Sequence, residues 1–269
     1  PEHDGESLPS NAIAHPHDNS TAWRADGLLW RGKGSDLAGA VETFRRVLAA
    51  SEEDGDLTGR VLGLVGMGST LVNLGEFDEA RRIGQRAVEL AGLLDASVEG
   101  AATAIVALAD IAAGRGEPAY EAVSAAWRHP GMRRGTVAIT VVAASALVAG
   151  EFAAAKQYAD EAVATLAGSH KMWALTLRAH IALDRGDDDS ATGDLREALC
   201  IAVANGSRMW VPEILETLAY VYALSAKHAE AARFLGAADA IRGRTGEVRW
   251  QMRESPYQMT IMSTREALG

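Results

Sequence analysis

Residues 64–80 read LVGMGSTLVNLGEFDEA, and this stretch decides the fold of the chain. Apolar residues recur at helical spacing through Leu64, Met67 and Leu71, which predicts one helix. Gly75 follows as a turn residue, because glycine readily adopts the left-handed conformation that ends a helix. A second helix is then expected around Ala80, so the stretch predicts a helix hairpin.

The alanine near the start of the second helix recurs along the chain, which indicates that the hairpin is a repeat. Each such alanine follows a turn residue by five positions. The alanines are Ala40, Ala80, Ala119, Ala155, Ala191 and Ala231, and the turn residues are Ser35, Gly75, Gly114, Gly150, Gly186 and Ala226. Small side chains are needed where two antiparallel helices cross closely. Larger ones are expected to fill the space between neighbouring hairpins, namely Phe77, Phe152, Leu195 and Leu235.

The repeat resembles the tetratricopeptide pattern in its small residue at the eighth position and in its turn glycine before an acidic, an aromatic and an acidic residue. We therefore expect an all-α solenoid of about six hairpins that forms a right-handed superhelix with a C-terminal capping helix. The expected helix pairs are 21–31 with 36–51, 58–74 with 77–93, 98–113 with 117–128, 134–149 with 152–167, 172–185 with 189–205, and 211–225 with 228–243. Residues 1–20 are expected to be a flexible leader, 21–243 the array and 244–269 the cap, with its helix near residues 256–268.

Residues 231–242 read AARFLGAADAIR, and residues 265–269 read REALG. Both stretches resemble the end of the helical sensor region in LuxR-type and antibiotic-regulator-type bacterial transcription regulators of the signalling-ATPase class. The resemblance implies an array that receives a small-molecule inducer or a partner protein and adjoins ATPase and DNA-binding domains. The chain itself contains neither a Gly-x-x-x-x-Gly-Lys-Ser/Thr phosphate loop nor a convincing DNA-reading helix-turn-helix.

Composition excludes several kinds of partner. With 36 acidic and 26 basic residues, the net charge is −10, so direct contact with nucleic acid is not expected. The longest apolar run is shorter than the roughly 20 residues that a membrane helix needs. The single cysteine, Cys200, lies in an apolar run and is expected to be a buried thiol, which fits a reducing cytoplasm.

No spacing of histidine, cysteine or carboxylate residues indicates a metal or catalytic site, and no cofactor is expected. The glycines of residues 63–68 resemble a dinucleotide loop, but they fall inside an expected helix with no strand before it. The cluster Asp184, Asp187, Asp188 and Asp189 is interpreted as a solvated turn in preference to a cation site.

In a tetratricopeptide-like array the first helix of each pair lines the inner curve, so its inner positions are candidate binding residues. The apolar candidates are Val72, Leu108 and Leu147, and the polar and aromatic ones are Trp173, Thr176, His180, Glu213, Glu216 and Tyr220. Such a surface would suit a peptide or partner helix with an apolar stripe and a positively charged end. The alternative is that tight winding buries these faces against one another and leaves no groove.

Taken together, these features predict a non-catalytic sensor domain of a bacterial transcription regulator. The alternative is a freestanding adaptor that holds a peptide or partner helix in its concave groove. Trp127, Trp210 and Trp250 lie near the pair boundaries and are interpreted as structural wedges between hairpins.

Overall fold

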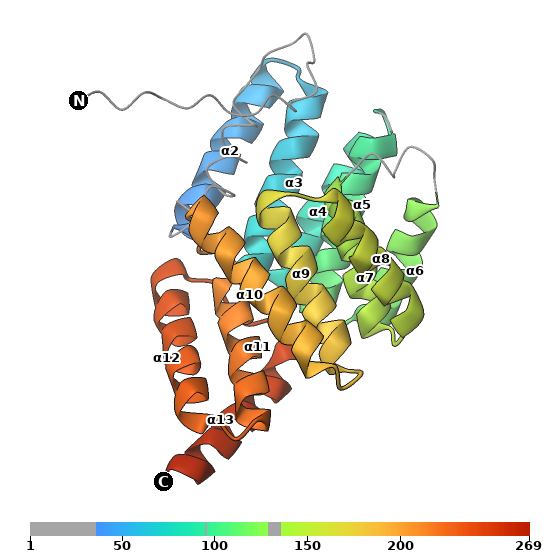
Figure 1. The fold of residues 1–269 in the computed structure, drawn as a ribbon. Helices are drawn as coiled ribbons and strands as arrows, with labels where there is room; N and C mark the ends of the chain where they lie inside the picture. Colours follow the sequence, from blue (N-terminus) through green and yellow to red (C-terminus); the bar gives the residue numbers. More distant parts are fainter. Residues whose placement is uncertain (1–35, 95, 129–135) are drawn as a thin grey trace, which may run out of the picture.

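The computed structural model describes residues 36–94, 96–128 and 136–269. Within these ranges the chain forms twelve helices and no strand (Figure 1). The helices are α2 (Leu37–Glu53), α3 (Leu57–Asn73), α4 (Phe77–Ala91), α5 (Ala96–Ala112), α6 (Gly116–Trp127), α7 (Thr136–Val148), α8 (Phe152–Thr165), α9 (Gly168–Leu183), α10 (Asp188–Asn205), α11 (Val211–Leu224), α12 (His228–Thr245) and α13 (Gln251–Leu268).

Glycines in the left-handed conformation end the first helix of several hairpins, as the repeat predicts. Gly150 and Gly186 have φ angles of 80° and 73°, and in the last hairpin Ala226 takes the same conformation at φ 57°. Aspartates begin other helices: the carboxylate of Asp56 accepts a hydrogen bond from the amide of Gly59 at 2.9 Å, and Asp187 does the same for Ser190 at 3.1 Å. The hairpin boundaries therefore follow from local backbone chemistry.

The small residues lie where helices cross. Ala80, Ala155, Ala191 and Ala231 are fully buried. At Gly84 on α4 a Cβ atom would stand only 3.1 Å from the backbone nitrogen of Val106 on α5, so the two helices approach too closely for a side chain there. The close crossing agrees with the steric reason for the repeated small side chains, although Ala40 on α2 is only half-buried.

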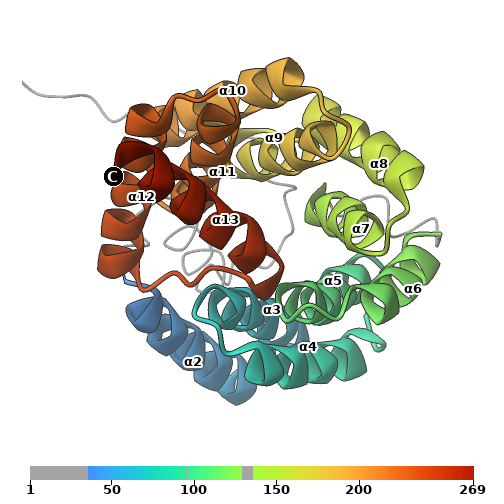
Figure 2. The same ribbon diagram turned by 90° about the horizontal axis from the view of Figure 1, so that it is seen from below.

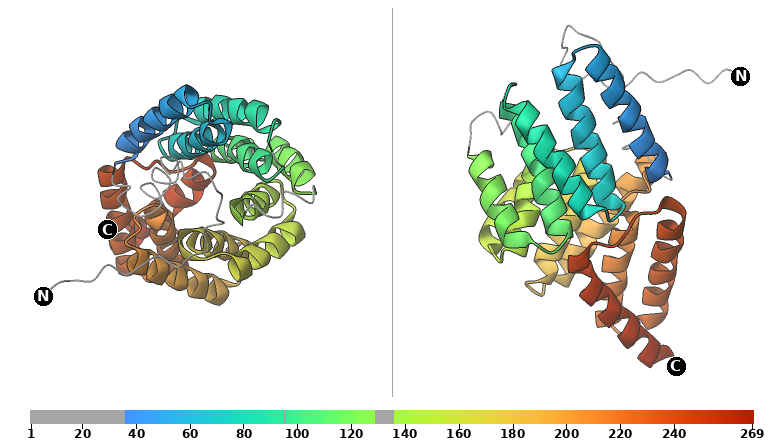
Figure 3. Two further views of the ribbon diagram at one scale, coloured as in Figure 1. Left: turned by 90° about the horizontal axis from the view of Figure 1, so that it is seen from above. Right: turned by 180° about the vertical axis from the view of Figure 1, so that it is seen from behind.

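The helices form two concentric layers around a superhelix axis (Figure 2). The first helices of the pairs, α3, α5, α7, α9 and α11, make the inner layer, and α2, α4, α6, α8, α10 and α12 make the outer layer. Figure 3 shows the chain advancing along the axis, with α2 near one end and α12 and α13 near the other. The expected all-α superhelix of hairpins is confirmed.

Several details differ from the expectation or lie outside the described residues. The leader at 1–20 and the expected helix at 21–31 lie outside them. Helix α9 begins at Gly168 and α13 at Gln251, four and five residues before the expected starts. Leu195 and Leu235 are buried as predicted, but Phe152 is 46% exposed, because it stands at the first turn of the outer helix α8. The prediction that Cys200 is buried is also wrong, since its side chain is exposed on the outer helix α10.

Helix α13 lies across one opening of the superhelix, where it packs against α11 and α12 and reaches α5 (Figure 2). The backbone amide of Val248, just before this helix, donates a hydrogen bond of 2.8 Å to the carbonyl of Asn73 at the end of α3. The chain end thus joins the last hairpin to the first one described in full. None of the described helices combines the length and apolar character needed to cross a bilayer.

Candidate functional site

The residues predicted to line the inner face do stand on the inner helices, but most of them are covered. Val72, Leu108, Leu147 and Trp173 belong to the main apolar cluster, and Thr176 is 1% exposed. The Thr176 hydroxyl donates to the carbonyl of Met172, one turn earlier. Of the remaining candidates, His180 and Glu216 are buried, whereas Glu213 and Tyr220 are half-buried.

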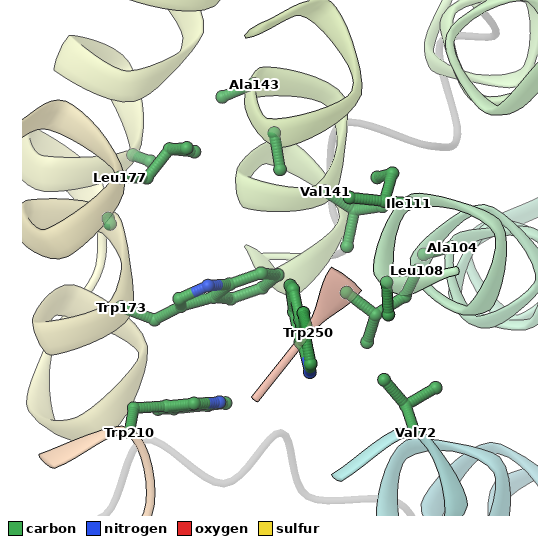
Figure 4. Close-up of a cluster of buried hydrophobic side chains, with 14 of the residues drawn as sticks. Val72, Ala104, Leu108, Ile111, Val141, Ala143, Trp173, Leu177, Trp210 and Trp250 are labelled. Atoms are coloured by element: carbon green, nitrogen blue, oxygen red, sulfur yellow. The ribbon is translucent and has the colours of Figure 1, made fainter. Parts of the chain in front are cut away.

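The C-terminal segment, residues 246–269, makes part of this cover. Figure 4 shows the indole of Trp250 between Trp173 on α9 and the side chains of Leu108 and Val72 on α5 and α3. Trp173 also stacks on Trp210, with ring centroids 5.5 Å apart and an interplanar angle of 19°. A cavity of only about 10 Å³ remains among Trp173, His180, Glu213, Trp250 and Arg253. The chain therefore fills this part of the inner face with its own residues.

Glu216 on α11 holds two guanidinium groups at once. Arg242 donates to it from Nε and Nη2 at 2.9 and 3.1 Å, and Arg249 from Nη2 and Nε at 2.8 and 3.1 Å. All three side chains are nearly buried, at 8%, 12% and 12% exposure respectively. Arg242 comes from the end of α12 and Arg249 from the C-terminal segment, so one carboxylate ties this segment to the last hairpin.

Glu213, one turn earlier on α11, joins His180 and Arg253. Its Oε1 atom lies 3.1 Å from Nε2 of His180 and 3.3 Å from Nε of Arg253. Burial alone would raise the pKa of Glu213, but the hydrogen bond with His180 and the positive charge of Arg253 lower it to about 2. Burial and the same Arg253 charge lower the pKa of His180. At neutral pH the cluster therefore contains an ionised Glu213 and a neutral His180.

Glu247 contributes a third carboxylate, from the loop between α12 and α13. Its Oε2 atom accepts a hydrogen bond of 3.3 Å from the backbone amide of Trp210. Burial raises the pKa of Glu247 to about 7, although the nearby Arg242 acts in the opposite direction. Trp210 itself has a φ of 61°, a left-handed conformation that is costly for a bulky side chain. The C-terminal segment thus helps to hold a strained residue at the start of α11.

A cavity of about 460 Å³ lies elsewhere, among the charged residues of α8, α9 and α10. Its charges pair with one another: Arg178 donates to both carboxylate oxygens of Asp194 at 2.7 and 2.8 Å, and Lys156 pairs with Asp160. The first pair lies within the hairpin of α9 and α10 and the second within α8, while Arg178 also lies 3.4 Å from Asp160 and so links the two hairpins. In the described part of the chain, no three or more histidine, cysteine or carboxylate residues come together in a way that could hold a metal ion.

Sequence reasoning missed the residues that close the inner face, Glu247, Arg249, Trp250 and Arg253. Trp250 was expected to be a wedge between hairpins, but it projects into the inner cluster (Figure 4). The available signal was the pattern Arg-Trp-x-x-Arg in a stretch after the last repeat, opposite two glutamates on the inner face.

Comparison with solved structures places this arrangement among known folds. The chain aligns over 90% of its length, and over 48% of the other chain, with a chain from the crystal structure of the APC/C hetero-tetramer Cut9–Hcn1, at a TM-score of 0.58 and 14% identity. The fold is a superhelix of tetratricopeptide-like hairpins. A tetratricopeptide repeat protein from Parabacteroides merdae aligns over 91% of this chain and 98% of its own, at 12% identity and a TM-score of 0.45.

The tetratricopeptide-like array also has relatives by sequence. It is 32% identical, over 251 residues and 92% of its length, to proteins of Mycobacterium tuberculosis and Mycobacterium bovis, each named as a putative HTH-type transcriptional regulator. The chain spans only 28% of the length of these relatives. No family model matches the chain. The array therefore aligns with one part of these much longer proteins.

Proposed function

We propose that this chain is the non-catalytic sensing arm of a bacterial transcription regulator, and that it binds a partner protein or an inducer on its inner face. The observation that carries the proposal is the 32% identity over 92% of the chain to proteins named as transcriptional regulators. A helical array without an evident catalytic constellation suits a binding role, since its surface is extended and curved.

The proposed binding residues are those of the inner face: Trp173, Thr176, His180, Glu213, Glu216 and Tyr220, with Val72, Leu108 and Leu147 along the apolar part. Binding would favour one of two arrangements of the array and so change the activity of the attached domains. The proposal includes an ATPase domain and a DNA-binding domain that adjoin this chain in the full-length protein. The net charge of −10 supports a regulator in which DNA is contacted by another domain.

The regulatory role is tested first by sequencing the intact gene. We expect the full reading frame to encode a phosphate loop and a helix-turn-helix outside the residues described here. A reading frame with neither module would contradict the regulator assignment and favour a freestanding adaptor.

The binding role is tested by thermal shift of the purified chain against defined peptide and small-molecule libraries. A ligand at a hundred times its dissociation constant stabilises a protein by about 2.7 kcal/mol, which corresponds to a shift of roughly 5–10 °C for a chain of this size. The variants Tyr220→Ala and Glu213→Gln, at the two candidates that are half-buried, should weaken that shift. A ligand that stabilises both variants as strongly as the wild type would show that the inner face is not the site.

A further inference from the structure

The proposed function leaves open what the partner looks like, and the chain's own C-terminal segment supplies the chemistry. We propose that the surface made by Trp173, Trp210, Glu213 and Glu216, here called the inner-face site, binds a partner segment with the pattern arginine–aromatic–x–x–arginine. Residues 249–253 of this chain, Arg-Trp-Gln-Met-Arg, occupy the site as an intramolecular competitor. This inference rests on the proposed function and names the partner class for the same site.

The charges of the site favour a cationic occupant. Glu213 and Glu216 face one resident cation, Arg242 of α12, and the other two guanidinium groups come from Arg249 and Arg253 of the C-terminal segment. Without that segment, two carboxylates would remain against a single arginine. Arginine suits such a place because its planar guanidinium pairs with a carboxylate through two hydrogen bonds, as Arg249 does here.

The apolar part of the site favours an aromatic ring between those two arginines. The stacked rings of Trp173 and Trp210, together with Leu108 and Val72 opposite, form the walls around Trp250 (Figure 4). An indole buries a large apolar area and prefers offset or edge contacts with other rings. Arg249 thus pairs with Glu216, and Arg253 lies beside Glu213. The ring of Trp250, between the two arginines, lies against Trp173.

The anchors of the C-terminal segment lie in the short stretch before and at the start of α13, and α13 itself packs on α11 and α12 with few buried residues. Along α13 only Thr260 and Thr264 are buried, while Met259 and Met262 are 50% and 61% exposed. By contrast, most residues of α11 are buried. A buried ion pair contributes little net stability, because its attraction is largely offset by the cost of desolvation. A partner that supplies equivalent pairs and an aromatic ring would therefore replace these contacts one for one when it exchanges with the segment.

The competition has a measurable consequence. A segment in the same chain acts at an effective concentration in the millimolar range, so it holds the site closed against a weak partner. The apparent dissociation constant of a partner is its intrinsic value divided by the fraction of open molecules. Weakening the chain's own anchor should therefore strengthen binding of an added peptide.

The experiment uses a fluorescent peptide with the sequence of residues 246–255 and measures its anisotropy with the full chain. We expect the Trp250→Ala variant to bind this peptide about tenfold or more tightly than the wild type does. The matched control is Met262→Ala, which changes an exposed residue of α13 and should bind the peptide as the wild type does. Peptides in which Trp250, or both Arg249 and Arg253, are replaced by alanine should lose at least about tenfold in affinity.

Two results would overturn the inference. One is equal binding of the peptide by Trp250→Ala and the wild type, with circular dichroism confirming that both are folded. The other is unchanged binding of the substituted peptides. Should Trp250→Ala fail to fold, Arg249→Gln opens the same site by removing a paired charge, and it must show the same gain. An exchanged dimer of wild-type chains would identify a second copy as the occupant and would also overturn the assignment to a partner protein.

The outcome separates this inference from the proposed function. A ligand whose thermal shift depends on Tyr220 but which does not displace the peptide would leave the sensing role intact and contradict the arginine–aromatic pattern. A peptide that binds as expected while no reading frame for a DNA-binding module exists would support the inference and contradict the regulator assignment.

Discussion

Trp250 closes the inner face with one side chain, and its removal should be costly. The indole is 9% exposed and lies among Trp173, Leu108 and Val72 (Figure 4). Replacing a buried aromatic residue with alanine removes apolar contacts and leaves a cavity, so Trp250→Ala should lower the free energy of unfolding by about 3 kcal/mol. Urea denaturation followed by circular dichroism measures the change.

Met262→Ala serves as its control, because Met262 is 61% exposed on α13. This substitution should change the free energy of unfolding by less than about 0.5 kcal/mol. Equal losses in the two variants would contradict the placement of Trp250 inside the inner cluster.

Glu247 should make stability depend on pH. Its folded-state pKa of about 7 lies above the ordinary value of 4.5, because the carboxyl is buried. The folded chain therefore binds this proton more strongly than the unfolded chain does. The associated stability is complete below about pH 4.5 and is lost as the pH rises through about 7. Glu247→Gln cannot ionise but can keep its hydrogen bond with Trp210. Between pH 5 and pH 8, its free energy of unfolding should therefore rise by about 2–3 kcal/mol relative to that of the wild type.

The measurement is urea denaturation of both proteins at pH 5 and pH 8. Comparing the variant with the wild type cancels other groups, such as His180, whose lowered pKa acts in the opposite direction within this range. The control Glu230→Gln, at an exposed position on α12, should show the pH dependence of the wild type. The account of Glu247 is wrong if the difference in free energy of unfolding between the variant and the wild type is the same at pH 5 and at pH 8.

Individual residues also show how far sequence reasoning reaches. The inner-face positions could be predicted, because repeat register assigns Trp173, Glu213 and Glu216 to the inner helices. Their partners could not, since Arg249 lies 33 residues from Glu216 and belongs to a stretch without helical periodicity. Only the folded chain brings the two together.

At the level of single elements, two glycines form a matched pair: one lies in the turn between α9 and α10, and the other lies inside α10. Gly186 has a φ of 73°, and a Cβ added there would meet no atom within 4 Å, so alanine would suffer only backbone strain. Gly186→Ala should destabilise the chain by about 1 kcal/mol. Gly193, inside α10, also has free space around it, and Gly193→Ala should stabilise by about 0.5–1 kcal/mol because alanine favours the helix.

Thermal denaturation of the two variants and the wild type measures both effects in one experiment. Opposite signs are expected. A stabilised Gly186→Ala would show that the turn does not need the left-handed conformation, which is the feature that sets the hairpin boundary.

The turns inside the hairpins were the most predictable boundaries, because Gly150, Gly186 and the buried alanines act locally. The start of α9 at Gly168 was missed. Its N-cap residue, Ala167, has no side chain that could mark the start of a helix in the sequence. The path of residues 246–250 was missed for a different reason. Its hydrogen bond with Asn73 joins residues at opposite ends of the array, and local sequence contains no signal for such a contact.

In the whole molecule, the C-terminal segment links parts that a simple stack would leave separate. Val248 bonds to the end of α3, Trp250 packs against α5 and α9, and Arg249 and Arg253 pair with α11. A stack of hairpins normally has only contacts between neighbours. Here one segment connects the two ends, so its release would free several inner helices at once.

Hydrogen–deuterium exchange of the full chain tests this account most directly, by comparing the wild type with Trp250→Ala. We predict that the amides of Trp210 and Val248, and those of α13, exchange about tenfold or more faster in the variant, while α4, α6 and α8 keep their protection. Unchanged exchange at Trp210 and Val248, or a uniform increase over all helices, would contradict the claim that the C-terminal segment is a separable occupant of the inner face.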